Sequence, residues 1–169
     1  MIETERLFHR RFTRDDLPWL IENRSPAAVN RYLGGPKMQS PEALSKRLDF
    51  YINCYQTAGV GMCAMGLKQT GELIGSSGLQ PLEDTGEIEV GYNLAEKFWR
   101  QGYGYEAAMG WLGYGFDVMG LERIVAVCHP DNTGSYKIME KCGMRYEKTE
   151  WHYGQDCLYY AVERAEFRR

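Results

Sequence analysis

Gly102 and Gly104 lie where a short strand is expected to give way to a helix, within the segment 92–107. The N-terminus of a helix exposes unpaired backbone N–H groups and the positive end of the helix dipole, so it binds anions, phosphates above all. Glycine also permits positive φ angles and a close approach of the backbone to a ligand. The segment therefore predicts a phosphate-binding loop, against the alternative of a tight strand-to-helix turn without a ligand.

Two well-known phosphate loops do not fit this segment. A Walker A loop requires a lysine followed by serine or threonine after its glycines, whereas Tyr105 and Glu106 follow Gly104. A dinucleotide fingerprint opens the first strand–helix–strand unit of a fold and has an acidic residue at a strand end about 20 residues later. Here three expected strands precede the glycines, and Asp117 falls within the expected helix. The sequence argues against both loops.

The strands before the loop must position it. An alternation of acidic or glycine residues with apolar ones over 87–92 indicates a strand with one buried face, and the runs 61–68 and 72–79 indicate two more. Short turns at 69–71 and 84–86 join the three runs. Strands connected in this way form an antiparallel meander, which leads into the predicted loop.

Helices are expected on both sides of this meander. A capping pattern at 13–16 precedes one helix, and Ser40-Pro41 predicts the start of an amphipathic helix over 41–58. A helix over 103–119 follows the loop, although each of its internal glycines costs up to about 1 kcal/mol relative to alanine. Packing must compensate for these glycines, or the helix is shorter than its apolar stripe. They are Gly110, Gly113 and Gly115.

The remaining elements complete one sheet. A further helix is capped by Asp131 or Asn132 and ends at Gly143. Hairpin-linked strands followed by strand–helix alternation predict an α+β fold with a central mixed, mostly antiparallel sheet and helices on both faces. We expect a single domain over 1–169, with parallel pairing beside the loop because a helix connects the strands there. The additional strands are expected near 6–12, 123–128, 144–153 and 156–164.

Length and composition narrow the classes of function. A chain of 169 residues, 44% of them hydrophobic, can bury a core without disulfides or a metal. Its net charge of −3 argues against a nucleic-acid-binding surface, and no apolar stretch reaches the ~20 residues of a membrane span. Five cysteines without a C-x-x-C pair indicate free thiols in the cytoplasm, and the scattered histidines lend no support to a metal site.

Two blocks of the sequence resemble the GCN5-related N-acetyltransferases (GNAT), and within them the branch that includes the ribosomal-protein N-terminal acetyltransferases. The segment 99–104 occupies the family signature Gln/Arg-x-x-Gly-x-Gly/Ala, with a tryptophan in the first slot, as this branch often has. Asn132, Ser135 and the segment 140–144 match the branch pattern N-x-x-S followed by E-K-x-G-F, with Met144 in place of phenylalanine. The resemblance runs from about residue 3 to residue 167.

The resemblance implies acetyl-coenzyme A (acetyl-CoA) as the donor and a primary amine as the acceptor. The backbone amides of Gln101–Tyr105 would bind the donor's pyrophosphate. Asn93 and Leu94 would pair with its pantetheine arm, and one of their N–H groups would polarise the thioester carbonyl. Arg100 is placed to meet a phosphate, with a solvated arginine as the alternative. The residues expected to bind the donor are Asn93, Leu94, Trp99, Arg100, Gln101, Gly102, Tyr103, Gly104, Tyr105, Asn132 and Ser135.

Two residues are expected to move protons. Glu89 is the candidate general base, because this branch often places an acid in the strand before the donor loop. Glu87 is the reserve, and a pair of solvated strand acids is the alternative. The resemblance implies that Ser135 hydrogen-bonds the departing thiolate, and we prefer it to Tyr136 because Met139 replaces the tyrosine acid of many family members.

Direct attack in a ternary complex requires a neutral amine. An α-amine, with a pKa of about 8, is roughly a tenth neutral at pH 7, whereas a lysine amine at about 10.4 is below a thousandth. The first acceptor candidate is therefore a protein N-terminal α-amine, and the second a small amine or amino-acid derivative. The alternative of a different class is a noncatalytic acyl-CoA sensor, suggested by Met139.

The acceptor site is the least determined part of the sequence. The segments 15–58 and 151–160 are expected to frame it, because they flank the acetyl group in the resembling fold. The resemblance also allows a homodimer, since dimerisation is common in this branch. The aromatic residues that are candidates to line the acceptor site are Trp19, Tyr32, Tyr51, Trp151 and Tyr153.

Overall fold

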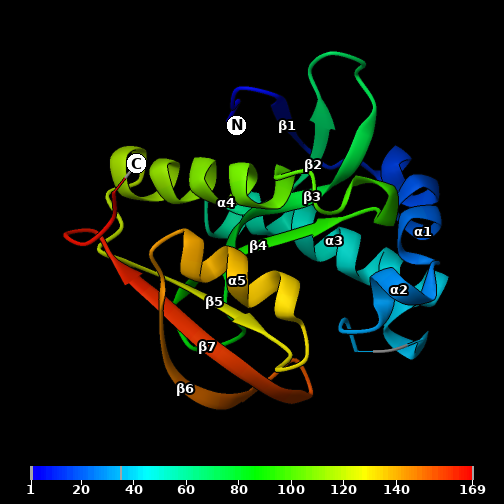
Figure 1. Cartoon of the computed structure of the whole chain (residues 1–169). Coiled ribbons are helices and arrows are strands. Elements are labelled where there is room, and N and C mark those ends of the chain that lie inside the picture. Colours follow the sequence, from blue (N-terminus) through cyan, green and yellow to red (C-terminus); the bar gives the residue numbers. More distant parts are fainter. Residues whose placement is uncertain (1, 35, 169) are drawn as a thin grey trace.

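Seven strands form one mixed sheet in the order β1-β2-β3-β4-β5-β7-β6 (Figure 1). The computed structural model describes residues 2–34 and 36–168. All neighbouring strands pair antiparallel except β4 and β5, which are parallel, as the sequence predicts. The strands are β1 (Leu7–Arg11), β2 (Gly61–Leu67), β3 (Leu73–Pro81), β4 (Ile88–Leu94), β5 (Arg123–Cys128), β6 (Arg145–His152) and β7 (Gln155–Glu163).

Helices cover both faces of this sheet. Met62 and Ala64 of β2 pack against α1 and α3, whereas Cys63, between them, packs in the core beneath α4 and α5. Neighbouring residues of a strand point to opposite faces, so the two helix pairs lie on opposite sides. The α+β prediction is confirmed. The helices are α1 (Leu17–Arg24), α2 (Ala27–Asn30), α3 (Pro41–Thr57), α4 (Tyr103–Gly113) and α5 (Thr133–Lys141), with 3-10 turns at Arg14–Asp16, Pro36–Gln39 and Glu96–Phe98.

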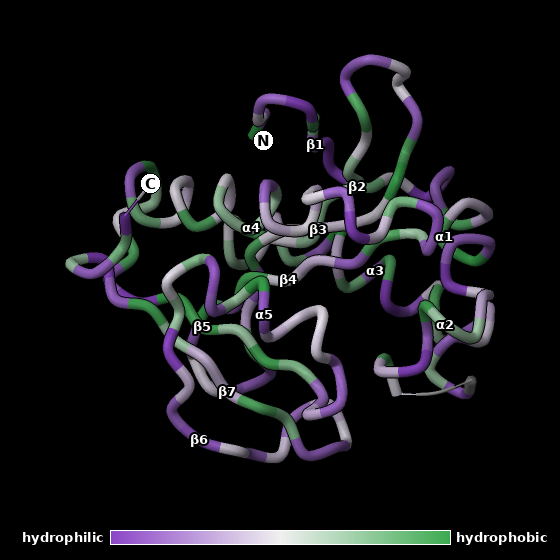
Figure 2. Tube along the Cα trace, viewed as in Figure 1, coloured by the Kyte–Doolittle hydropathy of each residue, from purple (hydrophilic) through white to green (hydrophobic). Residues whose placement is uncertain are grey.

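Hydropathy follows the layers of the fold. Hydrophilic residues run along the edge strand β6, whereas β5 inside the sheet is largely hydrophobic (Figure 2). Helix α3 covers the face of the sheet that faces away from α4 and α5. It begins where the sequence predicts, because the Ser40 side chain accepts a hydrogen bond from the amide of Ala43 at 3.2 Å. Its buried residues Leu44, Leu48 and Tyr51 pack on β2.

The expected helix over 103–119 is shorter in the structure. The α-helical part ends at Gly113, and a π-helical turn, Tyr114–Val118, replaces its last turn. Packing accounts for two of the internal glycines. A Cβ on Gly110 would lie 2.7 Å from a methyl carbon of Thr4, and one on Gly115 would lie 2.6 Å from Ile124. The helix therefore accepts glycines where the N-terminal segment and β5 approach it closely.

Strands β4 and β5 meet at one point and then separate. Over the described residues a single register pair, Glu89 with Val125, joins them, while β4 pairs with β3 as far as Leu94. Beyond Glu89, one side of β4 therefore faces a gap in the sheet. The N-termini of α4 and α5 follow β4 and β5 in the chain, so the predicted loop and the Asn132 cap both follow strands that border this gap.

Candidate active site

A cavity of about 400 Å³ lies at the gap between β4 and β5. Side chains from α1, α3, β3, β4, the end of β5, the start of α5 and the β6–β7 turn line it. It brings together four of the residues singled out in the sequence: Glu89, Asn93, Asn132 and Ser135. A cavity of this size suits a small ligand or the end of a longer one.

Glu89 is buried at this cavity, with 4% of its surface exposed. Burial raises the pKa of its carboxyl to about 7, although hydrogen bonds from Tyr153 and Gln80 favour the charged form. The Gln80 Nε2 group donates to Glu89 Oε1 at 2.6 Å, and the Tyr153 hydroxyl donates to the same oxygen. Of the two sequence alternatives, a solvated strand acid is wrong for Glu89, and a carboxyl with this pKa can exchange a proton near neutral pH.

The β6–β7 turn holds Tyr153 against Glu89. The Glu83 carboxylate accepts a hydrogen bond from the Tyr153 amide at 3.1 Å and contacts His152 Nδ1 at 2.8 Å. Glu150 contacts the other ring nitrogen of His152 at 2.9 Å. Glu83 and Tyr153 both have positive φ, +47° and +53°, a conformation that non-glycine residues adopt at a cost and that clusters at functional sites.

The reserve base, Glu87, has different partners. Its carboxylate accepts a hydrogen bond from the Tyr159 hydroxyl at 2.6 Å and lies 3.6 Å from Arg123 Nε. It precedes β4 and is absent from the lining of the cavity among the described residues. The geometry therefore favours Glu89 over Glu87 as the acid that faces a ligand.

The first turn of α5 presents a second polar group. Asn132 caps the helix, accepting from the Ser135 amide at 3.3 Å, so the capping interpretation holds while the residue also lines the cavity. The Ser135 hydroxyl donates to the Tyr92 hydroxyl at 3.3 Å, and that hydroxyl donates to the Ser135 carbonyl at 2.9 Å. Burial raises the pKa of Tyr92, which keeps it protonated at neutral pH. Met139 lines the cavity too.

The predicted donor loop, residues 99–105, lies outside this cavity. Gly102 caps α4 with φ +84°, and the first helical hydrogen bond runs from the Glu106 amide to the Gly102 carbonyl. The amides of Tyr103, Gly104 and Tyr105 come before that bond and have no carbonyl partner within the helix. Such a turn can accept an anion, as the sequence predicts.

The loop packs closely on the end of β4. A Cβ on Gly104 would lie 3.0 Å from Ile138 and 3.4 Å from Leu94, so only glycine lets α4 approach β4 and α5 this closely. The Trp99 indole donates to the Leu94 carbonyl at 2.8 Å and holds the loop over the strand end. Arg100 is exposed with φ +59° and has no ion-pair partner in the part of the chain that is described, which leaves both interpretations of this arginine open.

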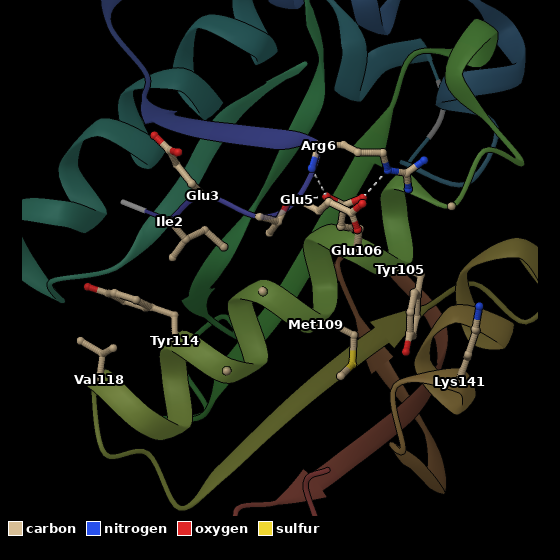
Figure 3. Close-up of a pocket in the computed structure, with 14 residues that line it drawn as sticks. Ile2, Glu3, Glu5, Arg6, Tyr105, Glu106, Met109, Tyr114, Val118 and Lys141 are labelled. Carbon is tan, nitrogen blue, oxygen red and sulfur yellow. Dashed lines mark hydrogen bonds and ion pairs between the residues drawn. The ribbon is translucent and has the colours of Figure 1, made fainter. Parts of the chain in front are cut away.

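A second, open groove of about 800 Å³ runs between the N-terminal segment and α4 (Figure 3). Glu106 receives hydrogen bonds there from Thr4 Oγ1 at 2.5 Å, the Arg6 amide at 2.7 Å and Arg6 Nε at 2.6 Å. Burial acts to raise the pKa of Glu106, but these hydrogen bonds and the charge of Arg6 hold it below the ordinary value. Arg6 also donates to the Gln101 carbonyl at 3.1 Å, so this network connects the N-terminal segment to the predicted donor loop.

The aromatic candidates divide between the site, the core and the surface. Tyr32, Tyr51 and Tyr153 line the cavity. Trp19 packs near Phe12 in the core under α1 and α3, and Trp151 is 66% exposed. Sequence reasoning missed four residues that contribute to the site through non-local contacts and carry no local motif: Gln80, Glu83, Tyr92 and His152.

The described residues offer neither a cluster of metal ligands nor a membrane-spanning helix. No group of three or more histidine, cysteine, aspartate or glutamate side chains in residues 2–34 and 36–168 is placed to hold a metal ion. Within the same residues, no helix has the length and apolar character needed to cross a membrane.

Comparison with known proteins places this architecture in a family. The model of the acetyltransferase (GNAT) domain matches residues 6–145. An uncharacterised N-acetyltransferase of Bacillus subtilis, YoaA, is 31% identical over 148 residues, which cover 87% of this chain and 84% of that protein. A GNAT-family acetyltransferase of Bacillus anthracis superposes with a TM-score of 0.80 at 30% identity, covering 98% and 99% of the two chains.

A more distant structure shares the fold. The ribosomal-protein α-N-acetyltransferase RimL, solved in complex with coenzyme A, superposes with a TM-score of 0.78 at 20% identity and 95% coverage of both chains. The family model, the relative and the solved structures agree with the α+β architecture described above. The chain therefore belongs to the GNAT acetyltransferase family, and it is an N-acetyltransferase.

Proposed function

We propose that this N-acetyltransferase takes the acetyl group from acetyl-CoA and transfers it directly to a primary amine, with Glu89 as the general base. The observation that carries the proposal is a buried carboxyl with a pKa of about 7 at the end of the β4–β5 contact, lining the cavity that also holds Asn132 and Ser135. A base is most effective when its pKa lies near the operating pH.

The residues around the gap fit an acyl-CoA donor. One side of β4 beyond Glu89 has no strand partner, and the side-chain oxygen of Asn93 is buried without a hydrogen-bond partner among the described residues. An extended amide-bearing arm such as pantetheine would pair with such a strand. The amides at the start of α4 suit a pyrophosphate. The residues that would hold the donor are those expected from the sequence, from Asn93 and Leu94 through Trp99–Tyr105 to Asn132 and Ser135.

The bound donor supplies an activated thioester, and the protein's own groups do the rest. Glu89 accepts a proton from the acceptor amine, directly or through a water molecule. A backbone N–H of Asn93 or Leu94 donates to the carbonyl oxygen as charge develops there. The Ser135 hydroxyl, which donates to Tyr92 in the unliganded site, would turn to donate a hydrogen bond to the thiolate as the carbon–sulfur bond breaks and coenzyme A leaves.

The acceptor is a primary amine of one of two kinds. A protein N-terminal α-amine is the first candidate, because its pKa of about 8 suits a base with a pKa of about 7. A small amine or amino-acid derivative is the second, and the cavity of about 400 Å³ favours it. A cytoplasmic location belongs to the same proposal, and five buried, free cysteines fit a reducing compartment.

A noncatalytic acyl-CoA sensor is the competing function, favoured by Met139 at the position of the usual tyrosine acid. Thermal shift with acetyl-CoA and a thiol-release assay over peptides and small amines separate the two. Stabilisation together with coenzyme A release supports the enzyme. Stabilisation without turnover on any acceptor supports the sensor, and no stabilisation at all contradicts both.

A further inference from the structure

Arg24, the last residue of α1, is 3% exposed and lines the active-site cavity. Its Nη2 group lies 3.5 Å from the Ser76 hydroxyl, at the limit of a hydrogen bond. Its Nε group is buried and has no hydrogen-bond partner among the described residues. No carboxylate within residues 2–34 and 36–168 forms an ion pair with it. The guanidinium is therefore a buried cation that, among the described residues, has the neutral partners Ser76 and Tyr51 but no carboxylate, and its Nε–H group is left without a partner.

A buried charge without a partner is strongly unfavourable. Burial, with Arg47 nearby, lowers the pKa of Arg24 below the ordinary value of arginine, whereas Tyr51 opposes that shift. Arginine nevertheless stays charged at neutral pH. A hydrophobic residue of similar volume would fill the same place without this cost. The position is therefore explained better by a ligand than by packing.

Arg47 of α3 lines the same cavity, and it too lacks a carboxylate partner in the described part of the chain. Two guanidinium groups thus contribute to the wall formed by α1 and α3. Glu83 and Glu89 contribute to the wall formed by the strands and the β6–β7 turn. The cavity has a cationic side and a carboxylate side, and a ligand that complements both carries an anionic group and an amine.

Unpartnered acceptor atoms lie along the strand wall of the cavity, one beside Glu89 and one near the Arg24 contact. Gln80 Oε1 and Asn93 Oδ1 are both buried without a hydrogen-bond partner among the described residues, and both residues line the cavity. Gln80 pairs in register with Glu89, and Ser76, which Arg24 contacts, pairs with Asn93. These two pairs are four residues apart along β4, about 13 Å at ~3.3 Å per residue. This is a distance along the backbone, and the side chains of Arg24 and Glu89 both reach into the same cavity, so the gap that a ligand must bridge between their charged groups is shorter.

We infer that the acceptor carries, besides its amine, an anionic group such as a carboxylate, which Arg24 binds with the help of Arg47. This inference rests on the proposed function, which supplies the reaction at the amine, and it deepens that function by naming the substrate class. The substrate is a small amino acid, and a peptide with an acidic N-terminal residue is the other source of the same chemistry. The donor's diphosphate is a poorer occupant, because residues 99–105 at its predicted site are not among the residues that line this cavity. A polyamine is a poorer occupant, because its second ammonium group would meet the two arginines.

The experiment compares acceptors of matched length that differ in charge, with kcat/KM expressed per neutral amine because amidation also lowers the pKa of the amine. Glycine, β-alanine, 4-aminobutyrate and 5-aminovalerate vary the distance from amine to carboxylate, and their primary amides remove the charge. Peptides that begin with aspartate or asparagine form the second arm. We expect kcat/KM for the best carboxylate to exceed that of its amide by about 10- to 100-fold, the range of a charge-assisted hydrogen bond. Equal values for every acid and amide pair would overturn the inference.

Variants locate the anion site. Arg47→Gln and Arg24→Met are expected to remove the preference for the carboxylate over its amide, mainly through KM, and Arg24→Lys is expected to restore part of it. Lys46→Gln is the matched control, because Lys46 is exposed, adjoins Arg47 and is absent from the cavity lining. Arg47 is only partly buried, so its variant keeps the test valid if Arg24→Met fails to fold.

A binding measurement separates this inference from the proposed function. Butyrate, which has a carboxylate and no amine, is titrated into the protein without donor and followed by thermal shift, with butyramide as its neutral counterpart. The anion site is supported if butyrate stabilises the protein, if Arg24→Lys retains this stabilisation and if Arg47→Gln weakens it. This conclusion holds even if no amine is acetylated, and in that case only the proposed function fails. Absence of any difference between butyrate and butyramide would count against the anion site, whatever the enzyme's turnover.

Discussion

Replacing Glu89 with glutamine tests the chemistry and the electrostatics of the site at once. The glutamine side chain would keep the size of the original and an acceptor oxygen for Tyr153, but it could not take a proton. General bases contribute about 10²- to 10⁴-fold to rate, so we expect kcat/KM to fall by this factor at pH 8. The wild-type profile should lose a factor of ten per pH unit below about 7, the pKa of the buried carboxyl, and the variant should lack this acidic limb.

The same substitution has a predictable effect on stability. Burial raises the pKa of Glu89 from 4.5 to about 7, so the folded state binds its proton more tightly than the unfolded state. Stability contributed by this group is therefore greatest below pH 4.5 and falls as the pH rises to about 7. At about 1.36 kcal/mol per pKa unit, the wild-type protein loses about 3 kcal/mol over that range, and the glutamine variant does not.

The assay is thermal unfolding of both proteins at pH 5 and pH 8, beside pH–rate profiles. About three quarters of this loss falls between pH 5 and pH 8, which for a domain of this size corresponds to about 5–10 °C, so the Tm of the variant relative to the wild type should be higher at pH 8 than at pH 5 by that amount. Glu87→Gln is the control, because Glu87 is paired with Arg123 and does not line the cavity. A Tm difference independent of pH, together with an unchanged acidic limb, would refute the assignment of Glu89.

Three further predictions concern the loops around the gap. Ser135→Ala should lower kcat by about 10-fold or more, a larger effect than on the dissociation constant of coenzyme A, and a change confined to affinity would contradict its role toward the departing thiolate. Gly102→Ala places a side chain at φ +84°, so it should cost about 1–2 kcal/mol of stability and weaken coenzyme A binding in a titration. Gly143→Ala is the control: its φ is +83° and its new Cβ would have no neighbouring atom within 4 Å, so it should cost as much stability and leave binding unchanged. Glu106→Gln removes a charged partner of Arg6 and should lower both the Tm and the affinity for coenzyme A, and unfolding followed by circular dichroism with and without ligand checks this.

Local signals in the sequence were sufficient for most elements of the fold. The start of α3 at Pro41 follows from a serine cap, and β4 follows from the alternation around Glu89, because both depend on contacts between neighbours in the chain. The end of α4 could not be placed in the same way. Its glycines are explained by approaches of Thr4 and Ile124, which lie far away in the sequence.

In the candidate site too, some residues can be found from local sequence signals and others only from the fold. Its donor loop is a short motif between β4 and α4, so the types and spacing of residues 99–107 are enough to indicate an anion site. Gln80, Tyr153 and Arg24 reach the cavity from three distant segments and have no motif that marks them. Their roles depend on which strands are neighbours and on where β4 leaves β5.

The sequence by itself determined the family and the α+β class, because both rest on short-range patterns, and the same kind of pattern predicts where the donor would bind. Only the tertiary structure decided that Glu89 is buried beside Tyr153 rather than solvated, that Glu87 pairs with Arg123, and that Arg24 faces the cavity without a carboxylate partner among the described residues. Burial and charge pairing depend on residues that come into contact only when the chain is folded, and they set the pKa values and the ligand preference of a site.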